Sequence, residues 1–220
     1  MTGWLAALER RRRVAHRRRM AGERGQGLVE FALITPVFVL ILLSMLDFGM
    51  AFYTNLTIEY ASREGARVGA ALAAGSPTLP CAQVDDYVMA AVQRVLESAG
   101  IAVDLNASGG GGVSWVKIYK ADSNGNGWTT ANVNTWTFSA GSGPTVDGRV
   151  LDFVKQGSDG WSACSRSNGT PPDSIGVAIE YTYAWITPIG SVASLIPGFA
   201  SLAQITFVDR TVMALNPTYP

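Results

Sequence analysis

Residues 25–53 read GQGLVEFALITPVFVLILLSMLDFGMAFY, and the interpretation of the whole chain depends on them. Sixteen uncharged residues begin at Phe31, and apart from Asp47 the apolar composition continues to Tyr53. A helix of these 23 residues would be about 34 Å long, enough to cross a hydrocarbon core of roughly 30 Å. A core helix of a soluble protein would carry a polar stripe with a period of 3.6 residues, and this run carries none. The stretch therefore predicts a transmembrane helix over about residues 31–53.

The two flanks of this run differ in charge. Residues 1–25 hold eight arginines and two glutamates, a net charge of +6, and the rest of the chain holds nine basic and fifteen acidic residues, a net charge of −6. By the positive-inside rule, arginines on one flank place the N-terminus in the cytoplasm and the body outside. Nucleic-acid binding by the arginine block is the other interpretation. Because an adjacent membrane span already explains the charge, we expect the lipid bilayer and no nucleic acid as a partner.

An ordinary secretory signal peptide is a poor alternative for the same stretch. The basic region is longer than usual, and the apolar run exceeds the roughly 7–15 residues of a typical signal sequence. No small-residue cleavage motif follows Tyr53, and the chain continues with a pattern that still predicts helix. We therefore expect the apolar run to stay in the protein as an anchor.

Three residues are unusual for such an anchor. Glu30 lies at its cytoplasmic edge, where a carboxylate costs a few kcal/mol if fully immersed, so it either marks function or reaches back to the headgroups. Pro36 removes a backbone hydrogen bond and favours a kink. Asp47 is a second charge, either exposed near the outer leaflet or in contact with a neighbour in a helix bundle. All three are candidates for contacts between subunits.

The sequence RGQGLVEFALITP resembles a type IV prepilin processing site. In that family a basic leader ends in glycine, and four mostly apolar or neutral residues precede a glutamate and an aromatic residue. The resemblance implies cleavage by a prepilin peptidase between Gly25 and Gln26, with Glu30 and Phe31 as the fifth and sixth mature residues. A cut after Gly27 fits the pattern less well. The new α-amine of Gln26, positive at neutral pH, would pair with Glu30 of a neighbouring subunit.

The resemblance extends beyond the processing site. The segment ASREGARVGA at residues 61–70 is similar to TadE-like proteins of tight-adherence (Flp-type) pili, and residues 177–217 resemble the closing half of that family. Residues 101–170 depart from the family pattern. The resemblance implies a minor pilin or pseudopilin, with other pilins and inner-membrane pilus assembly proteins as partners. It also implies a single-pass protein of the cytoplasmic membrane, with incorporation into an extracellular pilus allowed.

An alternative belongs to a different class of protein. The chain would then be a single-pass, membrane-anchored binding module outside the cytoplasm that is never processed. Such a protein would keep its leader and its full mass of 23.3 kDa.

The expected domain organisation has three parts. Residues 1–25 form the basic leader, residues 26–74 form the long helix that extends outside the membrane, and residues 75–220 form the exported body. The fold class is α+β and pilin-like, with the long helix, a second helix and an antiparallel sheet.

The elements of the body follow from local patterns. Apolar positions at helical spacing predict the second helix over residues 82–100. Alternation predicts a strand at 113–119. The strongest strands are predicted at 174–185 and 203–215, and weaker ones at 133–139 and 148–154. The apolar segment 186–202, interrupted by proline and glycine, is either a surface that meets the membrane or a partner, or a buried crossover.

Two cysteines, Cys81 and Cys164, lie far apart and form no CxxC or Cys/His cluster. With the body outside the cytoplasm, an intramolecular disulfide between them is favoured over two separate buried thiols.

Catalysis is not indicated by any motif. The only histidine, His16, lies in the leader, which leaves no Ser–His or Cys–His mechanism for the body. The chain contains no GxSxG, Walker or HExxH motif. We therefore expect no enzyme activity and no cofactor.

One segment weakly resembles a calcium loop. The sequence DSNGNG offers Asp122, Asn124 and Asn126 at the spacing of the first half of an EF-hand loop. Such a loop needs a glutamate at its twelfth position, which is Val133 here. A polar turn is the alternative. We therefore predict no metal site, and these three residues are only weak candidates for calcium ligands.

Overall fold

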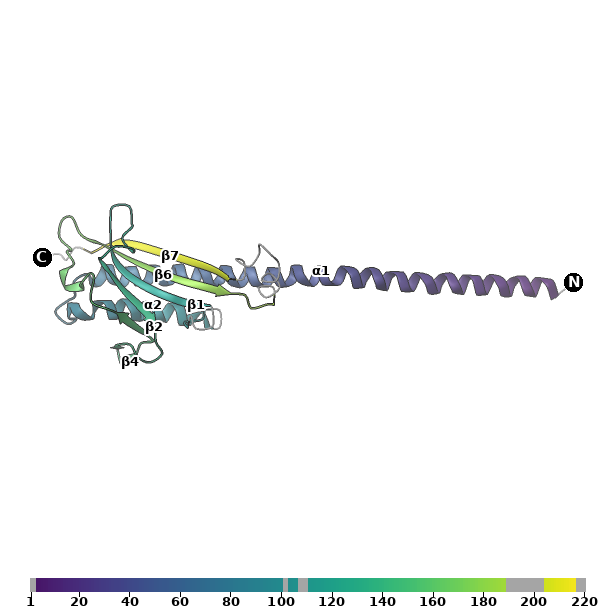
Figure 1. Cartoon of the computed structure of the whole chain (residues 1–220), viewed down its shortest axis with the longest axis horizontal. Coiled ribbons are helices and arrows are strands. Elements are labelled where there is room, and N and C mark those ends of the chain that lie inside the picture. Colours follow the sequence, from purple (N-terminus) through teal and green to yellow (C-terminus); the bar gives the residue numbers. More distant parts are fainter. Residues whose placement is uncertain (1–2, 101–102, 107–110, 189–203, 217–220) are drawn as a thin grey trace. The chain divides into compact units, whose positions relative to one another are not determined.

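The computed structural model describes residues 3–100, 103–106, 111–188 and 204–216, with side chains from residue 25 onward (Figure 1). Most of the predicted apolar segment 186–202 lies outside these residues. The chain divides into two compact units, residues 1–46 and residues 47–220.

All described residues of the first unit are helical. Helix α1 spans Gly3–Leu72 and continues through Pro36, and its residues up to Leu46 belong to this unit. From Leu28 to Leu46 the large apolar side chains are exposed on all sides of the helix, except for the half-buried Leu43. Gly25–Leu72 is long and apolar enough to cross a membrane, and it is the one such helix among the described residues. An apolar surface of this kind needs a cover of lipid or of other helices.

The second unit, called the body below, is an α+β domain. It contains α1 from Asp47 onward, helix α2 and a five-stranded antiparallel sheet in the order β5-β2-β1-β6-β7. The elements are α2 (Val84–Ser98), β1 (Gly112–Ala121), β2 (Val133–Phe138), β5 (Phe153–Gln156), β6 (Ser174–Ala184) and β7 (Gln204–Ala214). The short pair β3 (Thr145–Val146) and β4 (Arg149–Val150) forms a second sheet. The predicted α+β arrangement of a long helix, a second helix and an antiparallel sheet is confirmed.

One of the two weaker strand predictions differs from the structure in one detail. The expected strand at 148–154 is divided into β4 and β5. Between them the backbone N–H of Asp152 donates to Oε1 of Gln93 on α2, at 2.9 Å. The side chain of a helix residue therefore takes the place of a strand partner at this point.

Small residues of α1 let it pack closely on the rest of the body. A Cβ atom added to Gly65 would lie 2.6 Å from Val92 of α2, and one added to Gly69 would lie 2.5 Å from Ile175 of β6. Both distances are too short for an alanine without movement of the neighbour. Gly65 and Gly69 therefore serve close packing within the chain's own core.

The disulfide between Cys81 and Cys164 is present, as predicted. It joins the short 3-10 helices η1 (Cys81–Gln83) and η4 (Ala163–Ser165), with the two Cα atoms 4.9 Å apart. It closes a loop of 83 residues that contains α2 and the strands from β1 to β5. The start of α2 is thereby tied to the segment that leads into β6.

Candidate functional site

The predicted processing segment lies on the exposed part of α1. Gly25, Gln26, Glu30 and Phe31 are all exposed, and a Cβ atom added to Gly25 would meet nothing within 4 Å. The side-chain amide of Gln26 donates to Oε1 of Glu30 at 3.1 Å, one helical turn away. Glu30 is also the only charged residue between Gly25 and the end of this unit. The segment is therefore a regular helix with one carboxylate at the edge of an apolar surface.

Asp47 has a different environment, because it is buried within the body, with 1% of its surface exposed. Its Oδ1 accepts hydrogen bonds from the backbone N–H groups of Ile186, at 3.1 Å, and Thr187, at 3.3 Å. Its Oδ2 accepts a hydrogen bond from the Thr187 hydroxyl. Both carboxylate oxygens are therefore paired within the chain. A role for Asp47 between subunits stays a prediction.

Aromatic side chains surround this contact. The hydroxyl of Tyr183 donates to the backbone oxygen of Asp47 at 3.3 Å. Trp185 packs edge-to-face against both Phe48 of α1 and Tyr183 of β6, with ring centroids 5.6 and 5.9 Å apart. Burial raises the pKa of Tyr183 to about 12, and the charge of Asp47 and the neighbouring Tyr181 act in the same direction. The phenol therefore stays neutral and keeps its proton to donate.

The sequence did not reveal a second polar cluster, which lies in the core next to the disulfide. Arg166 donates from Nη2 to Oδ1 of Asp85 at 2.6 Å, and both side chains are almost fully buried. Oδ2 of Asp85 accepts a hydrogen bond from the side chain of Asn134, also at 2.6 Å. The Arg166 guanidinium lies 4.4 Å from the centre of the Trp161 ring. The one available signal was the nearness of Asp85 and Arg166 in sequence to the two cysteines.

The weak calcium candidate forms a hydrogen-bonded turn. Oδ1 of Asp122 accepts the backbone N–H groups of Asn124 and Asn126, each at 2.8 Å. The side-chain oxygen of Asn126 accepts a hydrogen bond from Arg210 at 2.8 Å. No group of three acidic, histidine or cysteine side chains that would hold a metal occurs in the described part of the chain. A guanidinium next to one of the three candidate ligands also works against a bound cation.

These features together define a class of protein: an apolar helix of membrane-spanning length joined to a disulfide-bonded α+β body. The family model described as TadE-like protein matches residues 25–67. The resemblance to TadE-like proteins of tight-adherence pili is confirmed over these residues, and it indicates a protein associated with such a pilus. No curated protein and no solved structure matches the chain. The resemblance of residues 177–217 to the same family stays a prediction.

Proposed function

We propose that the chain is a minor pilin or pseudopilin that takes part in the assembly of a tight-adherence pilus. In this proposal it enters the cytoplasmic membrane with its basic N-terminus in the cytoplasm and its body outside. A prepilin peptidase then cuts between Gly25 and Gln26. The mature protein joins other pilins and the inner-membrane assembly proteins through its exposed apolar helix.

One observation carries this proposal. The TadE-like match begins at Gly25, and the fifth residue after Gly25 is the lone carboxylate of the exposed apolar helix, Glu30. A carboxylate at the border of an apolar surface needs a cation when that surface becomes covered by other helices. Cleavage after Gly25 would create a cation at residue 26.

The geometry of the helix is compatible with this pairing. The side chain of Gln26 already lies within hydrogen-bonding distance of Glu30, so residues 26 and 30 share one face of α1. When neighbouring helices pack side by side, the α-amine of one subunit and the carboxylate of the next would meet on such a face. A charged hydrogen bond between them would stabilise the packed state more than the separate helices.

Substitutions at two glycines test the processing step. In cells that lack the chromosomal gene, Gly25→Ala should leave a precursor of full mass and few or no pili. Gly27→Ala is the matched control, because an added Cβ atom meets nothing within 4 Å at either glycine. It should be processed like the wild-type protein. If Gly27→Ala trapped the precursor and Gly25→Ala were processed normally, the cleavage site would lie after Gly27. Wild-type pili in cells without the gene would refute the assembly role.

The alternative function, an unprocessed membrane-anchored binding module, predicts a different pattern. Both glycine variants would then keep the leader, as would the wild-type protein, and pilus number would not depend on the gene. The two functions are thus separated by the mass of the wild-type protein in cells that contain an active peptidase.

A further inference from the structure

The uncharged part of the anchor is short for a bilayer. Between Glu30 and Asp47 lie sixteen uncharged residues, which as a helix measure about 24 Å. A hydrocarbon core measures roughly 30 Å, so about four more residues must lie at its depth. They are supplied either before Glu30, which would immerse its carboxylate, or from Asp47 onward.

The structure favours immersion of the residues from Asp47 onward. Glu30 is exposed, and its carboxylate has the Gln26 amide as a hydrogen-bond donor. Asp47 is buried, and it accepts hydrogen bonds from Ile186 and Thr187. If Asp47 lies at the edge of the hydrocarbon core, no unpaired carboxylate faces lipid, because both of its oxygens already accept hydrogen bonds within the chain. It also brings the end of β6 to the same depth, because Thr187 and Ile186 are bound to Asp47.

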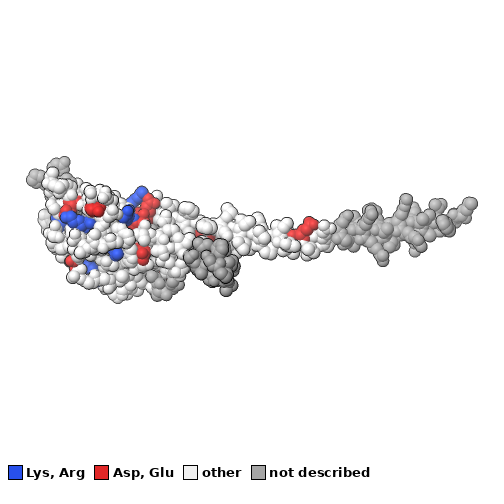
Figure 2. All heavy atoms as spheres, turned by 45° about the horizontal axis from the view of Figure 1, so that its top comes forward, with Lys and Arg blue, Asp and Glu red and all other residues white. Residues whose placement is uncertain are grey.

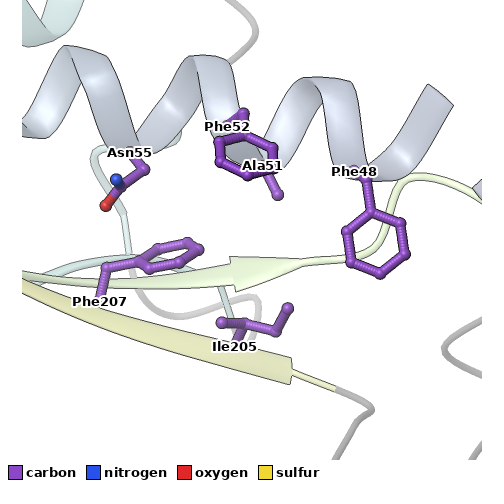
Figure 3. A pocket seen from close by; sticks show the side chains of 6 residues that line it. All are labelled: Phe48, Ala51, Phe52, Asn55, Ile205 and Phe207. Carbon is purple, nitrogen blue, oxygen red and sulfur yellow. The ribbon is translucent and has the colours of Figure 1, made fainter. Parts of the chain in front are cut away.

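The surface of the body near Asp47, where α1 enters it, is apolar and matches the chemistry of lipid. Between α1 and β7 lies a groove of about 190 Å³, lined by Phe48, Ala51, Phe52, Asn55, Ile205 and Phe207. In Figure 3 the side chains of Phe48, Ile205 and Phe207 point into the space between the helix and the strand. Phe52 and Ile186 are 69% and 64% exposed, an unusual state for large apolar side chains that face water.

Charge is sparse at the same end of the body, where Asp47 is buried and hydrogen-bonded and the exposed Asp104 lies beside Tyr181 of β6. The described segments 48–58 of α1, 181–188 at the end of β6 and 204–208 at the start of β7 carry no charged residue. On the face drawn in Figure 2, the blue and red side chains of the body gather at the left of the view, and the described surface of the body to their right is mostly white. Trp185, which is half-buried in this region, is of a residue type that favours the boundary between lipid and water.

We propose that this end of the body is immersed in the bilayer leaflet on its own side of the membrane, and that the groove takes a lipid acyl chain. The body then has its own contact with the membrane in addition to the anchor. The proposal rests on the membrane anchoring in the proposed function, but it holds whether or not the leader is removed.

Fluorescence of Trp185 provides the test. The full-length protein is reconstituted into phosphatidylcholine vesicles whose acyl chains carry bromine near the headgroup end, and the contribution of Trp185 is isolated by comparison with Trp185→Phe. We expect brominated lipid to quench this contribution and aqueous acrylamide to leave it largely unquenched. Phe52→Asp should abolish the quenching by lipid, because it places a charge in the groove.

Tyr60→Asp is the matched control for Phe52→Asp. Tyr60 lies on the same helix, is 61% exposed, and is about 12 Å further from the anchor. It should leave the quenching by lipid unchanged. The proposal would be overturned if acrylamide, and not brominated lipid, quenched the Trp185 fluorescence. It would also be overturned if neither reagent quenched it, because Trp185 would then be covered by protein. Flotation with the vesicles after an alkaline wash reports anchoring separately. If the protein did not float with the vesicles, both the membrane anchor and the immersion of the body would be refuted.

Discussion

The carboxylate of Asp47 accepts hydrogen bonds from both the backbone N–H and the hydroxyl of Thr187, which lies 140 residues further along the chain. Asp47 is the first residue of the compact body, directly after the exposed apolar helix. Thr187 follows the last strand residue of β6, Ala184, by three positions. The two residues therefore fasten the point where α1 enters the body to the end of a central strand.

Replacing Asp47 by alanine should destabilise the body. The change removes hydrogen bonds to a charged group, which contribute about 1.5–3 kcal/mol, and leaves the N–H of Thr187 without this acceptor. For a domain of this size the loss corresponds to a decrease of about 3–12 °C in the melting temperature. Near-ultraviolet circular dichroism in detergent measures it. Asp159→Ala, which removes an exposed carboxylate paired with Lys155, is the control and should melt within about 2 °C of wild type.

The buried pair of Asp85 and Arg166 should show strong coupling. Asp85→Ala alone leaves a buried guanidinium without its carboxylate and should lower the free energy of unfolding by about 3–5 kcal/mol. The double variant Asp85→Ala, Arg166→Met should be less destabilised than the single one, because no uncompensated charge remains. Urea unfolding of the three proteins in the same detergent measures the difference. Equal losses in the single and double variants would mean that the unpaired guanidinium carries no penalty in the core, which would contradict this prediction.

The disulfide should contribute a comparable amount. Joining residues 83 positions apart restricts the unfolded chain by about 4–5 kcal/mol in the chain-entropy account. The double variant Cys81→Ser, Cys164→Ser should lose up to this much stability. Alkylation of the wild-type protein without reductant should label no cysteine. Two labelled thiols in protein from the cell envelope would contradict both the bond and a body outside the cytoplasm.

Glu30→Gln should separate assembly from folding. We expect normal membrane insertion, since removing a charge favours insertion, together with fewer pili and less recovery of partner pilins. Glu59→Gln is the control, because Glu59 is a carboxylate on the same helix that already has a partner, Arg63. It should give wild-type pili at equal expression. Wild-type pilus number with Glu30→Gln would show that Glu30 only reaches the headgroups.

Much of the fold was predictable because it follows from local patterns. The uncharged run of α1, the helical spacing of α2 and the alternation in β1, β6 and β7 each appear within a single segment. Cys81 and Cys164 could be paired because the chain offers no other cysteine. In each case the sequence itself limits the partners to very few.

The contacts that the sequence did not reveal are polar and long-range. Asp47 was expected to be exposed or to contact a neighbour in a helix bundle. It is buried, and within the chain it accepts hydrogen bonds from the backbone N–H groups of Ile186 and Thr187, just beyond the end of β6. Arg166 and Asp85 are 81 residues apart, and neither carries a local pattern that marks it as buried. Backbone donors have no sequence signature, and one charged side chain among many in a chain of zero net charge does not identify its partner.

The residue at the N-terminus of the protein in cells tests the central claim most directly. The protein is isolated from the membrane or pilus fraction of cells with an active prepilin peptidase, and its N-terminal peptide is identified by mass spectrometry. The account predicts a mature chain that begins at Gln26, with Glu30 as its fifth residue. An intact leader beginning at Met1, or a chain that begins beyond Tyr53 and has lost the apolar helix, would contradict it.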